Sequence, residues 1–93
     1  MPHILLTRPH DLGLDGARRT AQDVAARLRR EFGVTTVSDG DTIHVEGRGV
    51  QGRLDAGPEE VRIEATLSLA ARPFRRALTR EIERELDRLV PAP

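Results

Sequence analysis

The amino-acid sequence predicts an α+β fold, with one antiparallel five-stranded curved sheet and two helices on one face, in the order strand, helix, four strands, helix. Three observations lead to this prediction. The chain has 93 residues, the size of a single small domain. Segments 14–32 and 70–90 place apolar side chains three and four residues apart, as amphipathic helices do. The other segments alternate apolar and polar residues between turns, which is typical of strands with one solvated face.

The first strand is expected over residues 3–8 and is stopped by Pro9, because proline has no N–H for a strand ladder. The first helix follows over residues 14–32. Its apolar stripe consists of Leu14, Ala17, Ala21, Val24, Ala25, Leu28 and Phe32. Asp11 or Gly13 can cap the start of this helix, and Gly33 can adopt the left-handed conformation that ends it.

The remaining strands are separated by turns that contain glycine. The expected strands are 34–38, 41–46, 50–55 and 61–69. The turns between them are Asp39-Gly40, Gly47-Arg48-Gly49 and residues 56–59. Asp39-Gly40 accepts the positive φ angles of a tight hairpin. If the last strand pairs with the first, the sheet order is second, third, fourth, fifth, first, and the final helix lies across the sheet in a small helix-grip-like arrangement.

The final helix is expected over residues 70–90, with Pro73 acceptable only in its first turn. Its apolar stripe consists of Phe74, Leu78, Ile82, Leu86, Leu89 and Val90. We expect this stripe to fill the core of the domain, although an amphipathic helix of this kind can also contact a hydrophobic surface.

The composition excludes several classes of function. Fifteen basic residues, all arginine, balance fifteen acidic residues, so no overall positive charge favours nucleic acid. Phe32 and Phe74 are the only aromatic residues, which leaves little on which bases could stack. Cysteine is absent, and no stretch approaches the roughly 20 apolar residues of a transmembrane segment. We expect a cytoplasmic protein that binds no nucleic acid.

The motifs do not predict an enzyme. Residues 47–52 spell G-x-G-x-x-G, but a strand rather than a helix is expected after them, so no helix N-terminus could receive a phosphate. His3, His10 and His44 lack the spacing of metal ligands. No serine lies in a nucleophile motif. We therefore expect no catalytic residue, metal or cofactor. His10, between the first strand and the first helix, is expected to have a structural role, with a role in a site as the alternative.

Arginine recurs every four residues along the final helix. These arginines are Arg72, Arg76, Arg80, Arg84 and Arg88. The spacing places them in one row, which could bind an acidic partner or phospholipid headgroups. Acidic residues alternate with them from Glu81 to Asp87, so a surface of mutually neutralising ion pairs is the competing interpretation.

Several short segments together resemble one family. They are residues 8–14 with Ala17-Arg18, then Phe32-Gly33, Asp39-Gly40-Asp41, Gly49-Val50-Gln51-Gly52 and the helix over 82–89. In order and spacing they are similar to the small polyhydroxyalkanoic acid system proteins, which are encoded near polyester storage genes in bacteria. The resemblance implies association with polyhydroxyalkanoate granules or with proteins bound to them, and it supplies no catalytic residues.

The expected function is therefore that of a non-catalytic accessory protein of polyester storage. Two alternatives stay open. A cavity between the sheet and the final helix could bind a small hydrophobic ligand such as an acyl or hydroxyacyl group. The exposed edge strand at residues 34–37 could add to a partner's sheet or form a homodimer.

Overall fold

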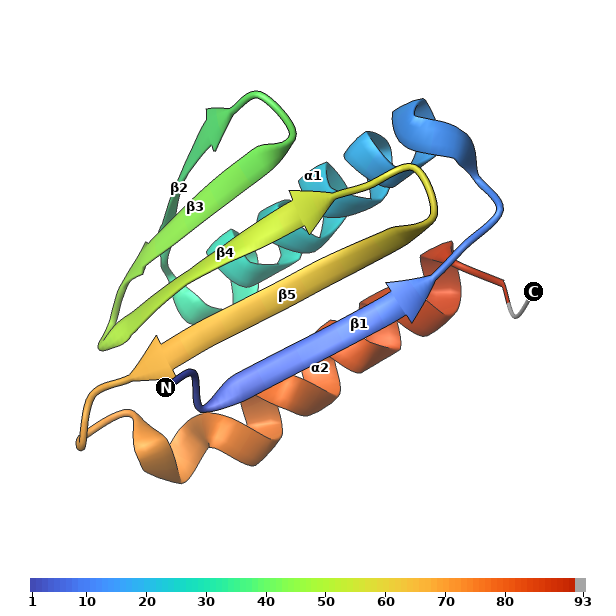
Figure 1. Ribbon diagram of the computed structural model, residues 1–93. Coiled ribbons are helices and arrows are strands. Elements are labelled where there is room, and N and C mark those ends of the chain that lie inside the picture. The colour runs from blue at the N-terminus through green and yellow to red at the C-terminus, as the bar shows by residue number, and fades with distance from the viewer. Residues whose placement is uncertain (92–93) are drawn as a thin grey trace.

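The computed structural model describes residues 1–91 and confirms the predicted fold class and element order. The elements are β1 (Ile4–Pro9), α1 (Gly13–Phe32), β2 (Thr35–Asp39), β3 (Thr42–Gly47), β4 (Val50–Ala56), β5 (Glu60–Leu67), a 3-10 turn η1 (Arg72–Phe74) and α2 (Arg75–Leu89). Figure 1 shows both helices behind the same face of the sheet. The described chain is elongated, with extents of 37 × 25 × 25 Å.

The sheet has the order β1-β5-β4-β3-β2, and all of its neighbouring strands are antiparallel, as predicted. β1 enters the sheet beside β5, where Ile4 lies opposite Ala65. β2 is the other edge strand. One face of the sheet packs on the helices, and the other carries charged side chains such as Arg53, which forms ion pairs of 3.0 Å with both Asp55 and Glu64. The strand alternation read from the sequence thus reflects one buried and one solvated face.

The start of α1 differs from the sequence prediction. Neither Asp11 nor Gly13 caps the helix, because the residue at the N-cap position is Leu12 and no side chain caps there. The Leu12 N–H instead donates a hydrogen bond to Nδ1 of His10 at 3.1 Å. Gly13 has a φ of +73° and turns the chain into the helix. At the other end Gly33 has a φ of +68°, which confirms the predicted left-handed end.

The core lies between the sheet and the two helices. α1 contributes small residues to it, including Ala17, Ala21 and Ala25, and contacts β3, β4 and α2. α2 contacts α1 and β1 and contributes Leu78, Ile82 and Leu86. These three residues of the predicted stripe are buried. Figure 1 shows α2 running alongside β1, so the two helices share the inner face of the sheet.

The connection between β5 and α2 departs most from the sequence prediction. β5 ends at Leu67 rather than at residue 69, and α2 begins at Arg75 rather than at residue 70. The Ser68 carbonyl oxygen accepts hydrogen bonds from the N–H groups of Ala71 and Arg72, which closes a turn between the two elements. Pro73 then lies in the 3-10 turn, where its missing N–H is tolerated. As a result Phe74, predicted in the buried stripe, is exposed.

Candidate binding surface on α2

The five arginines of the predicted row are all exposed. Arg72 lies in η1 and the other four lie in α2. They point away from the helix face that carries Leu78, Ile82 and Leu86, because those side chains are buried in the core. The structure divides the row into two parts with different surroundings.

The C-terminal part of the row is neutralised. Arg84 donates to Glu81 at 3.1 Å, and Arg88 donates to Glu85, which is only 4% exposed. The same two glutamates also accept hydrogen bonds from Arg27 of α1, at 2.8 Å to Glu81 and 3.3 Å to Glu85. For Arg84 and Arg88, the interpretation as a surface of ion pairs is therefore correct.

This charge cluster joins the two helices. The hydrogen bond to Glu81, supported by the charges of Glu81, Glu85 and Glu31, raises the pKa of Arg27 above its ordinary value despite the opposing effect of desolvation. Arg27 is therefore positively charged, as arginine side chains in proteins are. Glu81 and Glu85 therefore form part of a structural contact between α1 and α2.

The N-terminal part of the row has no such partners. Between residues 72 and 80 the chain carries four arginines, Arg75 included, and no acidic residue. Within residues 1–91 none of these four arginines forms an ion pair. A shallow, mostly polar hollow of about 280 Å³ lies beside them and is lined by Arg75, Arg76, Thr79, Arg80 and Glu83. This half of the row is available to an anion.

The charge order along α2 opposes the helix dipole. Cations are favoured at the C-terminus of a helix and anions at its N-terminus. In α2 the first turn contains Arg75 and Arg76 and no acidic residue, while the second half contains Glu81, Glu83, Glu85 and Asp87 together with Arg84 and Arg88. Arg75 and Arg76 thus occupy positions where a positive charge lowers the stability of the helix. Helix stability therefore does not explain these two arginines.

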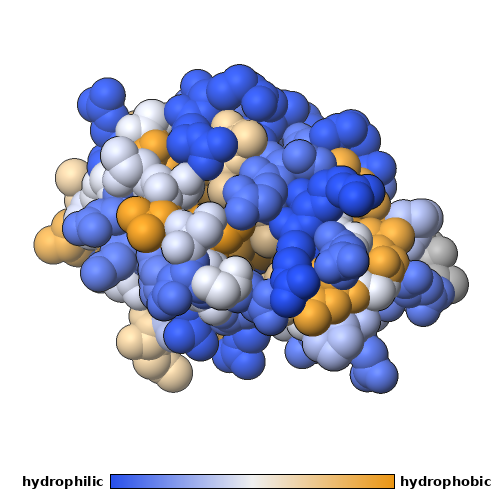
Figure 2. Space-filling model, turned by 90° about the horizontal axis from the view of Figure 1, so that it is seen from above, coloured by the Kyte–Doolittle hydropathy of each residue, from blue (hydrophilic) through white to orange (hydrophobic). Residues whose placement is uncertain are grey.

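Two exposed apolar side chains lie next to these arginines. Leu69, between β5 and η1, is 77% exposed, and Phe74, at the end of η1, is 63% exposed. We call Leu69, Arg72, Phe74, Arg75, Arg76 and Arg80 the corner patch. In Figure 2 the visible face is mostly hydrophilic, with small separate hydrophobic areas, one of them at the end where Figure 1 draws the β5–α2 connection.

One feature of the sequence indicates the corner patch, and the spacing of the arginines did not reveal it. The spacing of four residues placed all five arginines in one row, although the two halves of that row have different surroundings. The absence of acidic residues between 72 and 80 is visible in the sequence and separates the two halves. The exposure of Leu69 and Phe74 could not be read in this way, because both continue the apolar patterns of their neighbouring elements.

His10 has a structural role in the observed fold. Its side chain is buried, and its Nε2 lies 2.9 Å from the carbonyl oxygen of Gly57. Because Nδ1 accepts the hydrogen bond from Leu12, the proton of the neutral ring is on Nε2 and is donated to Gly57. The backbone N–H of His10 donates to the Glu59 carbonyl at 3.0 Å. The hydrogen bonds of His10 therefore hold the β1–α1 connection against the β4–β5 turn.

The three histidines do not form a metal site. His3 accepts a hydrogen bond from the Leu67 N–H at 2.8 Å, and His44 lies on the solvated face of the sheet. Within residues 1–91 no group of histidine, aspartate or glutamate side chains has the arrangement of a metal site. In the same part of the chain, no helix is long and apolar enough to cross a bilayer.

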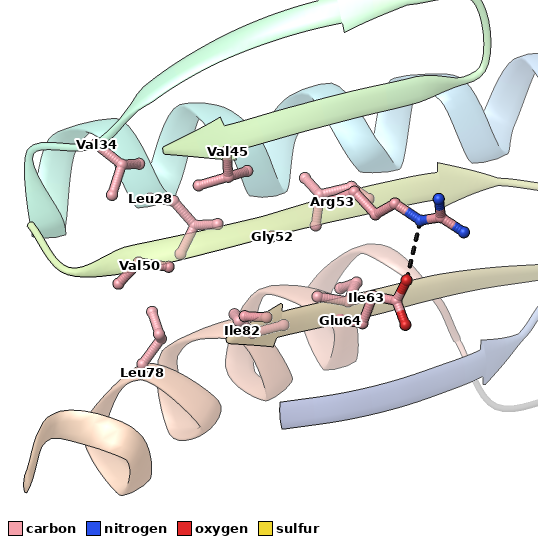
Figure 3. Close-up of a pocket in the computed structure, with 12 residues that line it drawn as sticks. Leu28, Val34, Val45, Val50, Gly52, Arg53, Ile63, Glu64, Leu78 and Ile82 are labelled. Atoms are coloured by element: carbon pink, nitrogen blue, oxygen red, sulfur yellow. Dashed lines mark ion pairs between the residues drawn. The ribbon is translucent and has the colours of Figure 1, made fainter. Parts of the chain in front are cut away.

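The interior between the sheet and the helices holds one small cavity. Its volume is about 20 Å³, and Gly52 and Ala65, which lie opposite each other in β4 and β5, are among the residues that line it. Figure 3 shows the side chains of Leu28, Val45, Ile63, Leu78 and Ile82 around this space. Ligand pockets usually have volumes of about 300 to 1,000 Å³. The cavity has room for about one water molecule, so this structure does not support the expected acyl-binding alternative.

Comparison with known proteins identifies the family. The family model described as "putative polyhydroxyalkanoic acid system protein" matches residues 4–90, which include every helix and strand of the structure. No curated protein and no solved structure gave a significant match. Because the family model covers nearly the whole chain, this protein belongs to the polyhydroxyalkanoic acid system protein family.

Proposed function

We propose that this protein is a non-catalytic accessory of polyhydroxyalkanoate storage that associates, in the cytoplasm, with the granules or with proteins bound to them. Membership of the polyhydroxyalkanoic acid system family supports a role in that system. The observation that carries the proposal further is the unpaired half of the arginine row, because four exposed guanidinium groups without acidic partners favour an anionic binding surface.

The buried stripe of α2 is not the binding surface in this proposal. Leu78, Ile82 and Leu86 are packed between α1 and the sheet, so they could reach a granule only if the core opened. Exposing three side chains of this size to water costs several kcal/mol, which is a large fraction of the stability of a small domain. Binding therefore uses the exposed side of α2.

The proposal is tested by fractionating a polyester-accumulating host that expresses the tagged chain. We expect the chain to float with washed granules, and we expect Arg76→Gln with Arg80→Gln to move it to the soluble fraction. The matched control is Arg19→Gln with Arg62→Gln, which removes the same charge from exposed sites on α1 and on the outer face of the sheet. A wild-type chain that stays entirely soluble would rule out granule association.

A second candidate function is self-association through β2. This strand pairs only with β3, and its residues 35–38 include neither proline nor a charge, the usual features that protect an exposed edge. Val37 at its centre is 65% exposed. An antiparallel pairing of two β2 strands would join two sheets into one homodimer.

Sedimentation velocity over a range of concentrations tests this candidate. A homodimer predicts a mass that rises with concentration, and Val37→Lys should return it to the monomer by placing like charges across the edge. The exposed Thr66→Lys change, on an internal strand, is the matched control. A constant monomeric mass at all concentrations would exclude the dimer.

A further inference from the structure

We propose that the corner patch binds an anionic lipid surface, with Leu69 and Phe74 entering the headgroup layer and the four arginines contacting lipid phosphates. This inference deepens the proposed function by naming the binding residues and the chemistry that they recognise. It rests on the proposed function only for the location of that surface in the cell.

The apolar part of the patch projects into solvent at one end of the molecule. Leu69 and Phe74 are two of the most exposed large apolar residues in the described chain, and they are separated by only one turn and η1. The hollow at Arg75 and Arg76 is mostly polar, and a second hollow of about 420 Å³ at the end of β5 is mostly apolar. Neither hollow is lined by Leu69 or Phe74. Apolar side chains that protrude from a protein can insert into the headgroup layer of a lipid surface, because that layer deforms around them. A groove on a protein partner would need a shape complementary to these side chains.

The charges around these residues are not used within the protein. Within residues 1–91, seven of the other eleven arginines contact a carboxylate, for example Arg8 with Asp87 at 2.6 Å and Arg18 with Asp41 at 2.5 Å, and the four that do not are Arg19, Arg29, Arg30 and Arg48. The four arginines of the patch have no such contact within residues 1–91. Arginine forms bidentate hydrogen bonds with phosphate, and each basic residue near an anionic bilayer strengthens its binding.

The rest of the fold brings further positive charge to the same end. The Ser68 N–H donates to the Gly49 carbonyl at 2.8 Å, so the β3–β4 turn lies against the β5–η1 connection. The Arg48 side chain in that turn lies beside Gly33 at the end of α1. This basic end carries Arg29, Arg30, Arg48, Arg72, Arg75 and Arg76, against the acidic residues Glu31 and Glu46.

The opposite end of the molecule is acidic. The Ala56 N–H donates to the Asp41 carbonyl, and the His10 N–H donates to the Glu59 carbonyl, so the turns around these residues and the start of α1 meet there. This end carries the acidic residues Asp11, Asp15, Asp39, Asp41, Glu59, Glu60 and Asp87, against the basic residues Arg8, Arg18, Arg19, Arg62 and Arg88. A chain with a net charge of zero is thus polarised along its length, and its basic end is attracted to an anionic surface while its acidic end is repelled.

Vesicle flotation with the purified full chain tests this inference. We expect binding to phosphatidylglycerol vesicles and little binding to phosphatidylcholine vesicles. Binding should weaken strongly between about 0.1 M and 1 M salt, because the Debye length falls from about 10 to 3 Å. Arg75→Gln with Arg76→Gln should reduce affinity about 30-fold, and Leu69→Ser with Phe74→Ser should reduce it at least about tenfold.

Matched controls remove the same groups from other surfaces. Arg19→Gln with Arg62→Gln removes two exposed arginines, and Val37→Ser removes an exposed apolar side chain on β2. Both variants should bind as the wild type does. Equal binding to the two kinds of vesicle, or binding unaffected by either corner variant, would overturn the inference.

The vesicle experiment tests the inference and the granule experiment tests the proposed function, so each can be contradicted without the other. A chain that floats with granules but not with phosphatidylglycerol vesicles would keep the proposed function and replace the lipid surface with a granule-bound protein. A chain that binds these vesicles through the corner patch but never floats with granules would keep the inference and remove the proposed function.

Discussion

At the scale of single residues, buried polar contacts and close backbone approaches decide how the ends of the elements meet. His10 is the clearest case, because one side chain satisfies a backbone N–H at the start of α1 and a carbonyl in the β4–β5 turn. The sequence located this residue correctly between a strand and a helix. It could not identify Gly57 as a partner, since that contact spans 47 positions of the chain.

His10→Ala is expected to destabilise the protein by about 1 to 2 kcal/mol, because it removes the hydrogen-bond partners of two partly buried backbone groups. Urea unfolding followed by circular dichroism measures this change. His44→Ala, at an exposed position, should cost less than about 0.5 kcal/mol. Equal stability of the two variants would contradict the structural role of His10.

Gly52→Ala is expected to cost about 1 to 3 kcal/mol through overpacking. A Cβ atom at this position would lie 3.0 Å from Cα of Ala65 and even closer to the Glu64 carbonyl oxygen, so β4 and β5 would have to separate. Gln51→Ala, on the solvated face beside it, is the control and should be nearly neutral. The measurement is again the free energy of unfolding in urea, and a neutral Gly52→Ala would contradict the close approach of the two strands.

At the scale of elements, α2 combines a core-forming face, a contact with α1 and the proposed binding surface. The apolar spacing predicted the first of these, since Leu78, Ile82 and Leu86 are buried as expected. The contact with α1 depends on Arg27, which lies 54 and 58 positions before Glu81 and Glu85 and donates hydrogen bonds to both. Spacing within one helix contains no information on such a contact.

Arg27→Gln is expected to cost about 2 kcal/mol, because it leaves the nearly buried Glu85 with Arg88 as its remaining ion-pair partner. Thermal and urea unfolding measure this loss, and Arg19→Gln, on the exposed side of α1, is the control. The double variant Arg27→Gln with Glu85→Gln should lose less free energy of unfolding than the two single variants lose together. If the double loss equals the sum of the two single losses, the two residues are not coupled.

Arg76→Glu is expected to stabilise the folded protein by about 0.3 to 1 kcal/mol, because it replaces a cation with an anion near the N-terminus of α2. The same change should abolish binding to anionic vesicles. Arg88→Glu, in the last turn, should instead destabilise the protein, since it breaks the pair with Glu85. A loss of stability in Arg76→Glu would contradict the view that this arginine is kept for binding.

At the scale of the whole molecule, the periodicity of the sequence predicted the fold well, because period-two and period-3.6 patterns directly reflect which side chains face the core. Two features of the surface could not be predicted. The turn at Ser68 and the 3-10 turn at Pro73 together expose Leu69 and Phe74, although both residues continue the apolar patterns of β5 and α2. A net charge of zero also conceals a basic end and an acidic end, which exist only once the elements are placed in space.

The central claim is that the basic end of the molecule associates with granules. Mixing the purified chain with isolated, washed granules and separating them by flotation tests this claim most directly. We expect the wild type and the Arg19→Gln, Arg62→Gln control to float with the granules at about 0.1 M salt, and the Arg75→Gln, Arg76→Gln variant to stay in solution. Recovery of all three chains on the granules, or of none, would contradict it.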